Sequence, residues 1–170
     1  MKRAAAILCM DIGLVALLMP LAIPSRVQLV YNPSDSVPRG WYRIVPADLP
    51  QVGSIVLARL PASAAALAAQ RDYLPAGVPL LKRIGAVAPQ LVCMDGGAVR
   101  IENVPVATVM RADGRGRPLS AWSQCRRLAH GELFLLSNTN PASFDSRYFG
   151  PILASSVIGN AQPLWTWDMP

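Results

Sequence analysis

The chain has 170 residues and a net charge of +6 at pH 7, and 52% of its residues are hydrophobic against 15% charged. This length allows one domain with its own hydrophobic core once a membrane segment is set aside. The basic residues are scattered, which argues against nucleic-acid binding. No Cys-x-x-Cys pair or Cys/His cluster indicates metal or thiol chemistry.

The N-terminal segment predicts a membrane anchor. Residues 4–23 contain a single charged side chain and follow the cationic start Lys2-Arg3. About 20 apolar residues suffice to cross a bilayer, and the positive flank predicts a cytoplasmic N-terminus. A cleaved secretory signal is the alternative, but no clear small-x-small cleavage site follows the apolar stretch. We expect a cytoplasmic N-terminus and transmembrane signal-anchor over residues 1–25, and an extracytoplasmic, periplasmic domain over residues 26–170.

The exported part reads mostly as short strands separated by turn residues. Asp95-Gly96-Gly97 between apolar runs predicts a hairpin, and the alanine-rich Ala62–Arg71 predicts the single helix. The expected fold is therefore a mainly β domain with one short helix, preceded by an N-terminal transmembrane helix. The segments rich in β-branched, aromatic and leucine residues are Val27–Tyr31, Gly40–Val45, Ser54–Leu60, Pro79–Val87, Val99–Asn103, Val106–Met110, Glu132–Ser137 and Ser156–Trp165.

Two cysteines, Cys93 and Cys125, lie in the exported part. In an oxidising compartment they can pair and close a loop of about 30 residues, for which chain entropy gives about 3–4 kcal/mol of stabilisation. We therefore expect a structural disulfide between them.

A sharp bend follows the first exported strand and carries two serines, Ser34 and Ser36, flanked by prolines. A nucleophile needs an exposed position on a bent backbone, with free backbone N–H groups nearby to bind an oxyanion. Clusters of Ser, Asp and Pro also form ordinary turns. This segment alone therefore does not establish a site.

A second segment supplies a candidate general base. If it forms a strand, Leu80, Lys82 and Ile84 share one face, because side chains alternate along a strand. Apolar neighbours desolvate a lysine and lower its pKa, as a general base requires, although its head could equally reach water. The only histidine, His130, has no distinguishing neighbourhood, and Lys82 is the only lysine in the exported part. A serine hydrolase built on this chain would therefore use Lys82.

A third segment, residues 143–150, is a polar patch between apolar strands. Its Asp145 and Arg147, together with Ser143 and Ser146, could form a buried hydrogen-bonded network that orients a catalytic group. A surface loop with a local ion pair is the alternative.

Taken together, the three segments resemble the boxes of the signal peptidase family of Ser/Lys peptidases. Pro33-Ser34-Asp35-Ser36 resembles the nucleophile box, Lys82-Arg83 the general-base box, and residues 143–150 the downstream Asp-Ser-Arg-Tyr box. All three occur in the family's order behind an apolar N-terminal segment.

The nucleophile box departs from that of the housekeeping leader peptidases. Those enzymes have a methionine after the nucleophile and a proline two residues beyond that methionine, whereas here Val37-Pro38 follows directly, one residue shorter, and Asp35 replaces a common glycine. The shorter box is similar to that of TraF-type conjugative transfer peptidases, which process a pilin precursor and in some members cyclise it.

The resemblance implies a signal-peptidase-like β domain that carries out acyl transfer. Ser36 would be the nucleophile and Lys82 its general base, and the Ser36 backbone N–H and the Ser34 hydroxyl would form the oxyanion hole. No metal or cofactor is required.

The resemblance also implies that Ser143 orients the lysine while Asp145 and Arg147 pair to hold the loop. The expected partners are a pilin or other exported precursor and inner-membrane lipid, and no nucleic acid. The expected location is the bacterial inner membrane, crossed once, with the catalytic domain in the periplasm. Two alternatives remain, a general type I signal peptidase and a non-catalytic envelope scaffold of a transfer apparatus.

Overall fold

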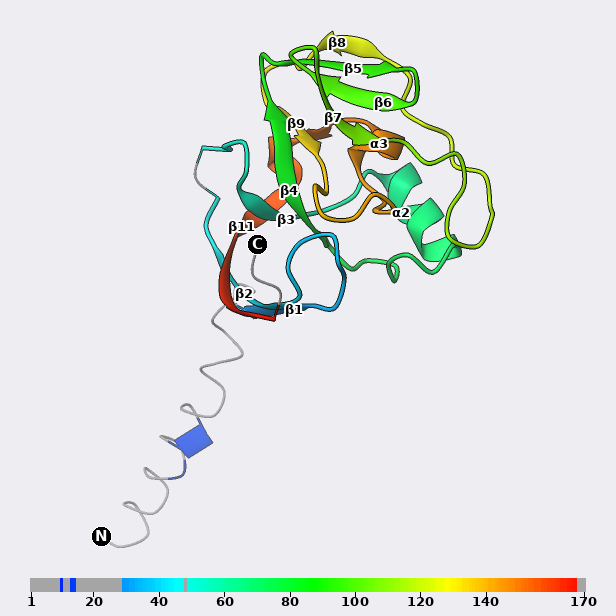
Figure 1. Cartoon of the computed structure of the whole chain (residues 1–170). Helices are drawn as coiled ribbons and strands as arrows, with labels where there is room; N and C mark the ends of the chain where they lie inside the picture. Colours follow the sequence, from blue (N-terminus) through cyan, green and yellow to red (C-terminus); the bar gives the residue numbers. More distant parts are fainter. Residues whose placement is uncertain (1–9, 11–12, 15–28, 48, 168–170) are drawn as a thin grey trace, which may run out of the picture.

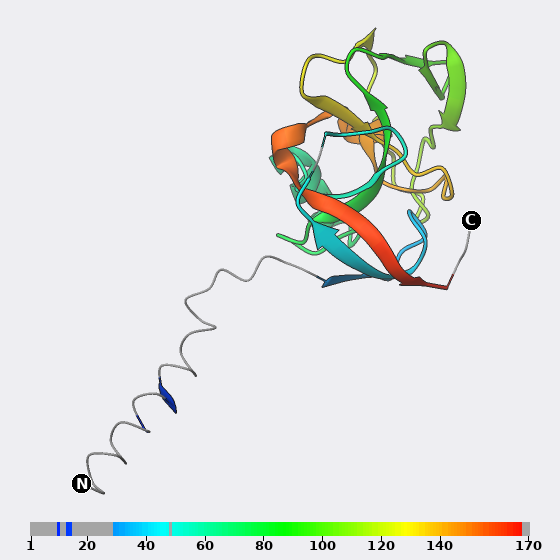
Figure 2. The same cartoon turned by 90° about the vertical axis from the view of Figure 1, so that its left-hand side faces the viewer.

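The structure is a computed structural model that describes residues 10, 13–14, 29–47 and 49–167. Two antiparallel sheets make up most of it. The larger sheet has seven strands in the order β1-β2-β11-β3-β4-β9-β10, and the smaller has four in the order β7-β6-β5-β8. Figure 1 shows the four-stranded sheet at one end of the molecule, and Figure 2, turned by 90°, shows the pronounced twist of the long strand β11. The strands are β1 (Leu29–Asn32), β2 (Gly40–Val45), β3 (Ile55–Ala58), β4 (Leu80–Val87), β5 (Leu91–Asp95), β6 (Ala98–Ile101), β7 (Val104–Thr108), β8 (Cys125–Arg127), β9 (Glu132–Leu135), β10 (Ile152–Leu153) and β11 (Val157–Thr166).

This architecture confirms the expected mainly β fold and its short helix, and the structure adds one further helical turn, α3 (Ser146–Phe149). The helix α2 (Ala62–Gln70) buries Ala64 and Ala68 against the rest of the domain. The expected hairpin joins β5 to β6, and its Gly96 and Gly97 have φ values of 56° and 81°. Glycine adopts this left-handed conformation without a Cβ penalty, which explains why the two residues mark the turn.

Differences from the expected elements occur where a segment is short or polar. The sequence pattern does not indicate β8, a strand of three residues that forms because it pairs with β5. This pairing places Cys125 opposite Cys93, and the expected disulfide joins them. The strand expected over Val99–Asn103 ends earlier, because Glu102 and Asn103 have positive φ values of 49° and 67° in the turn to β7.

The strand β4 lies inside the seven-stranded sheet, hydrogen-bonded to β3 on one side and β9 on the other. Its Leu81 packs in one core cluster with Val37 and Tyr42, and its Ile84 packs in a second cluster with Leu135. A side chain in the middle of β4 is therefore removed from water on both faces of the sheet.

No helix in the described ranges is long and apolar enough to cross a membrane. The anchor expected over residues 1–25 lies outside the described residues, apart from Met10 and residues 13–14.

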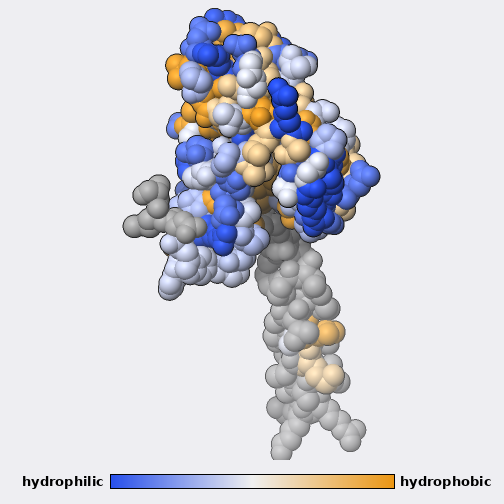
Figure 3. Space-filling view, turned by 45° about the vertical axis from the view of Figure 1, so that its right-hand side comes forward, coloured by the Kyte–Doolittle hydropathy of each residue, from blue (hydrophilic) through white to orange (hydrophobic). Residues whose placement is uncertain are grey.

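The described surface mixes hydrophobic and hydrophilic side chains, and on the face drawn in Figure 3 the hydrophobic ones gather in its upper half.

One exposed aromatic cluster lies where β1, β2 and the end of β11 meet. The ring centroids of Tyr31 and Trp41 are 5.1 Å apart, and those of Tyr31 and Trp167 are 6.0 Å apart. Trp165 extends the cluster, with its ring 6.4 Å from that of Trp167.

A fully buried ion pair lies at the start of the short helix α3 (Ser146–Phe149). The side chains of Asp145 and Arg147 are 0% and 1% exposed. The guanidinium donates from Nε and Nη2 to the two carboxylate oxygens, at 2.8 Å each. Its remaining N–H groups are directed at backbone carbonyls, those of Thr108, Asn140, Pro141 and Ser143. Full pairing of both groups offsets the desolvation of the two charges.

We expect Arg147→Ala to lower the free energy of unfolding by about 3–5 kcal/mol, because it leaves the Asp145 carboxylate buried without its partner. Urea denaturation measures this loss. Arg115→Ala is the matched control, since its pair with Asp72 is exposed at 64% and 71%, and such pairs contribute about 0–1 kcal/mol. Equal losses in the two variants would contradict a special role for the buried pair.

Candidate active site

The loop between β1 and β2 carries the two serines singled out in the sequence. The pair Asn32↔Gly40 closes this loop at the sheet. Gly40 has a φ of 148°, and a Cβ there would collide with the backbone of β11, so glycine alone lets the loop end this close to the sheet. Ser34 is exposed, whereas Ser36 is turned inward and is 6% exposed.

The backbone around Ser36 is held by the loop that follows β9. Ser137 Oγ donates to the Ser36 carbonyl at 2.9 Å, and Thr139 Oγ1 donates to the Asp35 carbonyl at 2.8 Å. In a trans peptide the N–H points away from the carbonyl, so the Ser36 N–H points away from Thr139. It donates to no acceptor among the described residues. This N–H is therefore available to a bound ligand.

The amine of Lys82 is buried in the middle of β4. Lys82 is 3% exposed, and its Nζ donates a hydrogen bond to Ser143 Oγ. Burial disfavours the ammonium and lowers the Lys82 pKa from 10.5 to about 8, while the negative charge of Asp145 opposes this effect and the positive charge of Arg147 adds to it. The burial of Lys82 in β4 agrees with the prediction that its apolar strand neighbours remove it from water.

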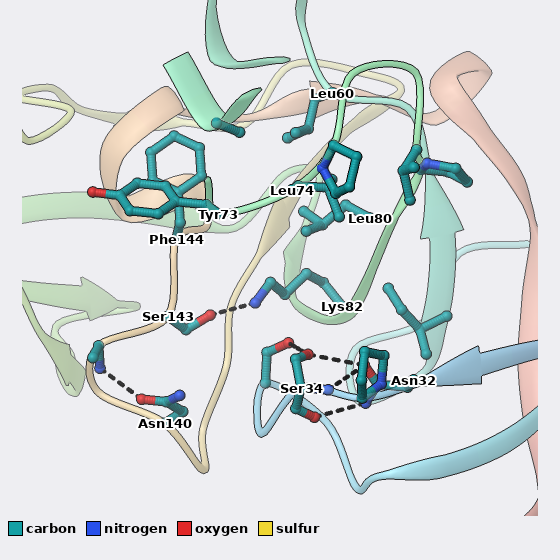
Figure 4. Close-up of a pocket in the computed structure, with 18 of the residues that line it drawn as sticks. Asn32, Ser34, Leu60, Tyr73, Leu74, Leu80, Lys82, Asn140, Ser143 and Phe144 are labelled. Carbon is teal, nitrogen blue, oxygen red and sulfur yellow. Dashed lines mark hydrogen bonds between the residues drawn. The ribbon is translucent and has the colours of Figure 1, made fainter. Parts of the chain in front are cut away.

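A cavity of about 590 Å³ brings the expected polar groups together. Ser34, Ser36, Lys82 and Ser143 all line it, and Figure 4 shows the amine of Lys82 directed at Ser143. No hydrogen bond joins Ser36 to Lys82 in the described part of the chain. In ligand-free active sites such contacts are often long and tighten when substrate binds. The rest of the lining is mostly apolar and includes Leu60, Tyr73, Leu74, Leu80 and Phe144.

The Asp145–Arg147 pair lies behind this cavity and supports both of its sides. Arg147 Nη2 donates to the carbonyl of Ser143 at 3.0 Å, which fixes the residue whose hydroxyl holds the lysine amine. Asp145 Oδ2 accepts the N–H of Ser137 at 3.0 Å, and Ser137 in turn holds the carbonyl of Ser36. Of the two interpretations of residues 143–150, the buried network is therefore correct and the surface loop is wrong.

Sequence reasoning misses three residues that shape the site. Ser137 ends the strand expected over Glu132–Ser137, and Thr139 follows in a polar run before Pro141. Neither pattern gives a sign of their contact with a loop more than 100 residues away. Asn32, followed by a proline, indicates only a turn. In the structure Asn32 is 4% exposed and bonds repeatedly to the loop that it precedes.

The sequence of this chain is similar to a known protein family and to several known proteins. Residues 1–167 match the family model described as "Signal peptidase, peptidase S26". A probable conjugal transfer protein TraF of Sinorhizobium fredii is 37% identical over 146 residues, which cover 80% of this chain and 76% of that one. A plasmid transfer protein TraF of Escherichia coli is 30% identical over 80% of this chain and 82% of its own length.

Among solved structures, a signal peptidase I from Enterococcus faecalis V583 is 22% identical and aligns over 67% of this chain and 97% of its own, with a TM-score of 0.41. The family match over residues 1–167 and the sequence relatives show that the chain belongs to the signal peptidase family, peptidase S26.

Proposed function

We propose that this chain is a serine endopeptidase that cleaves an exported precursor, with Ser36 as nucleophile and Lys82 as general base. The observation that carries the proposal is the buried amine of Lys82, which shares a cavity with Ser36 and has a pKa lowered to about 8. At pH 7 a pKa of about 8 leaves about a tenth of the lysines neutral, against fewer than about one in a thousand at the ordinary value. Only the neutral amine can accept a proton.

The reaction begins when neutral Lys82 Nζ takes the proton of Ser36 Oγ and the oxygen attacks the scissile carbonyl. The Ser36 N–H and the Ser34 hydroxyl stabilise the oxyanion, and one such donor contributes about 10²–10³ in rate. The Lys82 ammonium then gives its proton to the departing amine, which leaves an acyl group on Ser36. Water, or an amino group of the substrate, displaces this acyl group and regenerates the serine. Ser143 keeps the amine directed into the cavity throughout.

The proposed substrate is the pilin precursor of a conjugal transfer system. The relatives named as conjugal and plasmid transfer proteins support a role in conjugation. The short nucleophile box, with Val37-Pro38 directly after the serine, supports a transfer peptidase over a general type I signal peptidase. Displacement by the pilin's own amino terminus would give a cyclic product, and displacement by water a linear one.

The proposed location is the bacterial inner membrane, with residues 26–170 in the periplasm. The apolar residues 4–23 are long enough for a bilayer span. The exposed aromatic cluster of Tyr31, Trp41, Trp165 and Trp167 suits a membrane–water interface, where tryptophan and tyrosine are enriched.

Ser36→Ala and Lys82→Ala are each expected to abolish processing of a co-expressed conjugal pilin precursor, because one removes the attacking oxygen and the other the base. Mass spectrometry of the co-expressed pilin measures the outcome. Ser155→Ala, an exposed serine outside the cavity, is expected to process normally. Normal processing by both active-site variants would instead favour the non-catalytic scaffold.

The rate of peptide cleavage is expected to depend on pH through Lys82. Because the neutral amine is the active form and its pKa is lowered to about 8, kcat/KM should rise about tenfold per pH unit below pH 8 and level off above it. A pH series on purified full-length chain tests this. A rate that levels off below about pH 7 would point to a different base.

The buried amine should also reduce stability at neutral pH. The folded-state pKa of about 8 lies below the ordinary value of 10.5. Below pH 8 Lys82 is protonated in both the folded and the unfolded chain, and the folded chain carries the full cost of burying the ammonium. Between pH 8 and pH 10.5 only the unfolded chain binds this proton, so the free energy of unfolding rises with pH.

Lys82→Met is therefore expected to raise the free energy of unfolding at pH 7 by about 1–3 kcal/mol. The gain should shrink as the pH approaches 10.5. Urea denaturation of wild type and variant at pH 7 and pH 10 measures both effects. A variant less stable than wild type at pH 7 would show that the ammonium is well accommodated and that its pKa is not lowered.

A further inference from the structure

The buried side chain of Asn32 directs every hydrogen bond recorded for it into the loop that carries Ser36. Its Nδ2 donates to the carbonyls of Ser34, Val37 and Pro38 at 2.8, 3.0 and 3.1 Å. Its Oδ1 accepts from the N–H and the hydroxyl of Ser34 at 3.2 and 2.8 Å. These contacts bracket Ser36 on both sides, so one amide fixes the shape of the loop.

The orientation of this amide is determined by its partners. Carbonyl oxygens only accept hydrogen bonds, so the group that faces the three carbonyls must be the NH₂ of Asn32. The oxygen Oδ1 therefore faces Ser34 and can only accept. It follows that the Ser34 hydroxyl donates its proton to Asn32.

The direction of the neighbouring hydrogen bond follows from this. Ser34 Oγ and Ser36 Oγ are 2.9 Å apart, and either could be the donor from distance alone. Since the proton of Ser34 is already given to Asn32, Ser36 must be the donor. In the ligand-free chain the two hydroxyls thus form a directed chain from Ser36 through Ser34 to Asn32.

We infer that Asn32 is a positioning residue for the nucleophile. It holds the loop so that the Ser36 N–H and Oγ face the cavity, and it holds the Ser34 hydroxyl in one direction until an oxyanion replaces the amide oxygen as its acceptor. Asn32 acts through Ser34 and Ser36, and the inference rests on the Ser36 nucleophile proposed above. Misplacement of a reacting group by about 1 Å can cost about 10² in rate.

A burst experiment separates positioning from folding. Full-length chain is mixed with p-nitrophenyl acetate, and released p-nitrophenolate is followed in a stopped-flow instrument. The amplitude of the burst measures the fraction of chains with an intact site. The acylation rate constant reports how well the Ser36 hydroxyl is positioned for attack. The variants are Asn32→Ala, which removes all the bonds, and Asn32→Asp, which keeps the size and the acceptor but cannot donate to the carbonyls.

Both variants are expected to keep an amplitude close to that of wild type and to lose about 10² in the acylation rate constant. In Asn32→Ala the pH midpoint of this rate constant should stay at that of wild type, because the substitution brings no charge into the cavity that Lys82 lines. Asn160→Ala, in β11 of the same sheet, is expected to react as wild type does. In the Asn32→Ala/Ser34→Ala double variant the loss should be smaller than the product of the two single losses, because both residues act through one hydrogen bond.

A rate constant within about threefold of wild type in either folded variant would overturn the inference. So would a loss of amplitude with an unchanged rate constant, or failure of both variants to fold, because Asn32 would then support the fold and not the nucleophile. Ser36→Ala is run alongside. If it still gives the burst, the proposed function fails; if it gives none while the Asn32 variants react normally, only the positioning role fails.

Discussion

The buried pair of Asp145 and Arg147 is the interaction on which the arrangement of the site depends. Neither charge would be tolerated in the interior alone, and each is fully hydrogen-bonded by the other and by backbone groups. The pair also reaches both halves of the cavity. Its guanidinium fixes Ser143 behind the lysine amine, and its carboxylate fixes Ser137 behind the Ser36 loop. The loop that carries Ser36 and the distant segment of residues 137–145 are thereby held in fixed positions relative to each other.

Burial of Lys82 connects the stability of the fold with its chemistry. The position in the middle of β4 lowers the lysine pKa, and the same desolvation that makes the amine a usable base makes the ammonium costly at neutral pH. The hydroxyl of Ser143 is a neutral partner that can accept from the ammonium. A carboxylate in its place would stabilise the ammonium and raise the lysine pKa, which would work against the proposed role.

Local patterns could predict much of the fold and the main polar groups of the site. Strand alternation places Lys82 between Leu80 and Ile84, and the absence of another lysine in residues 26–170 singles it out. Residues whose importance comes from distant contacts could not be found in this way. Nothing in the local sequence around Ser137 and Thr139 indicates that the fold brings them against the Ser36 loop, and β8 forms only because β5 lies beside it. The main polar groups of the candidate site are therefore predictable from residue types, while their positioning depends on the tertiary structure.

The most direct test of the account is to identify the atom that becomes acylated. The full-length chain is mixed with p-nitrophenyl acetate, quenched with acid within one turnover, digested and mapped by mass spectrometry. The account predicts one acetyl group, located on Ser36, that is absent when Lys82 is replaced by alanine. An acetyl group on another residue, or acylation of Ser36 that is unaffected by the loss of Lys82, would contradict it.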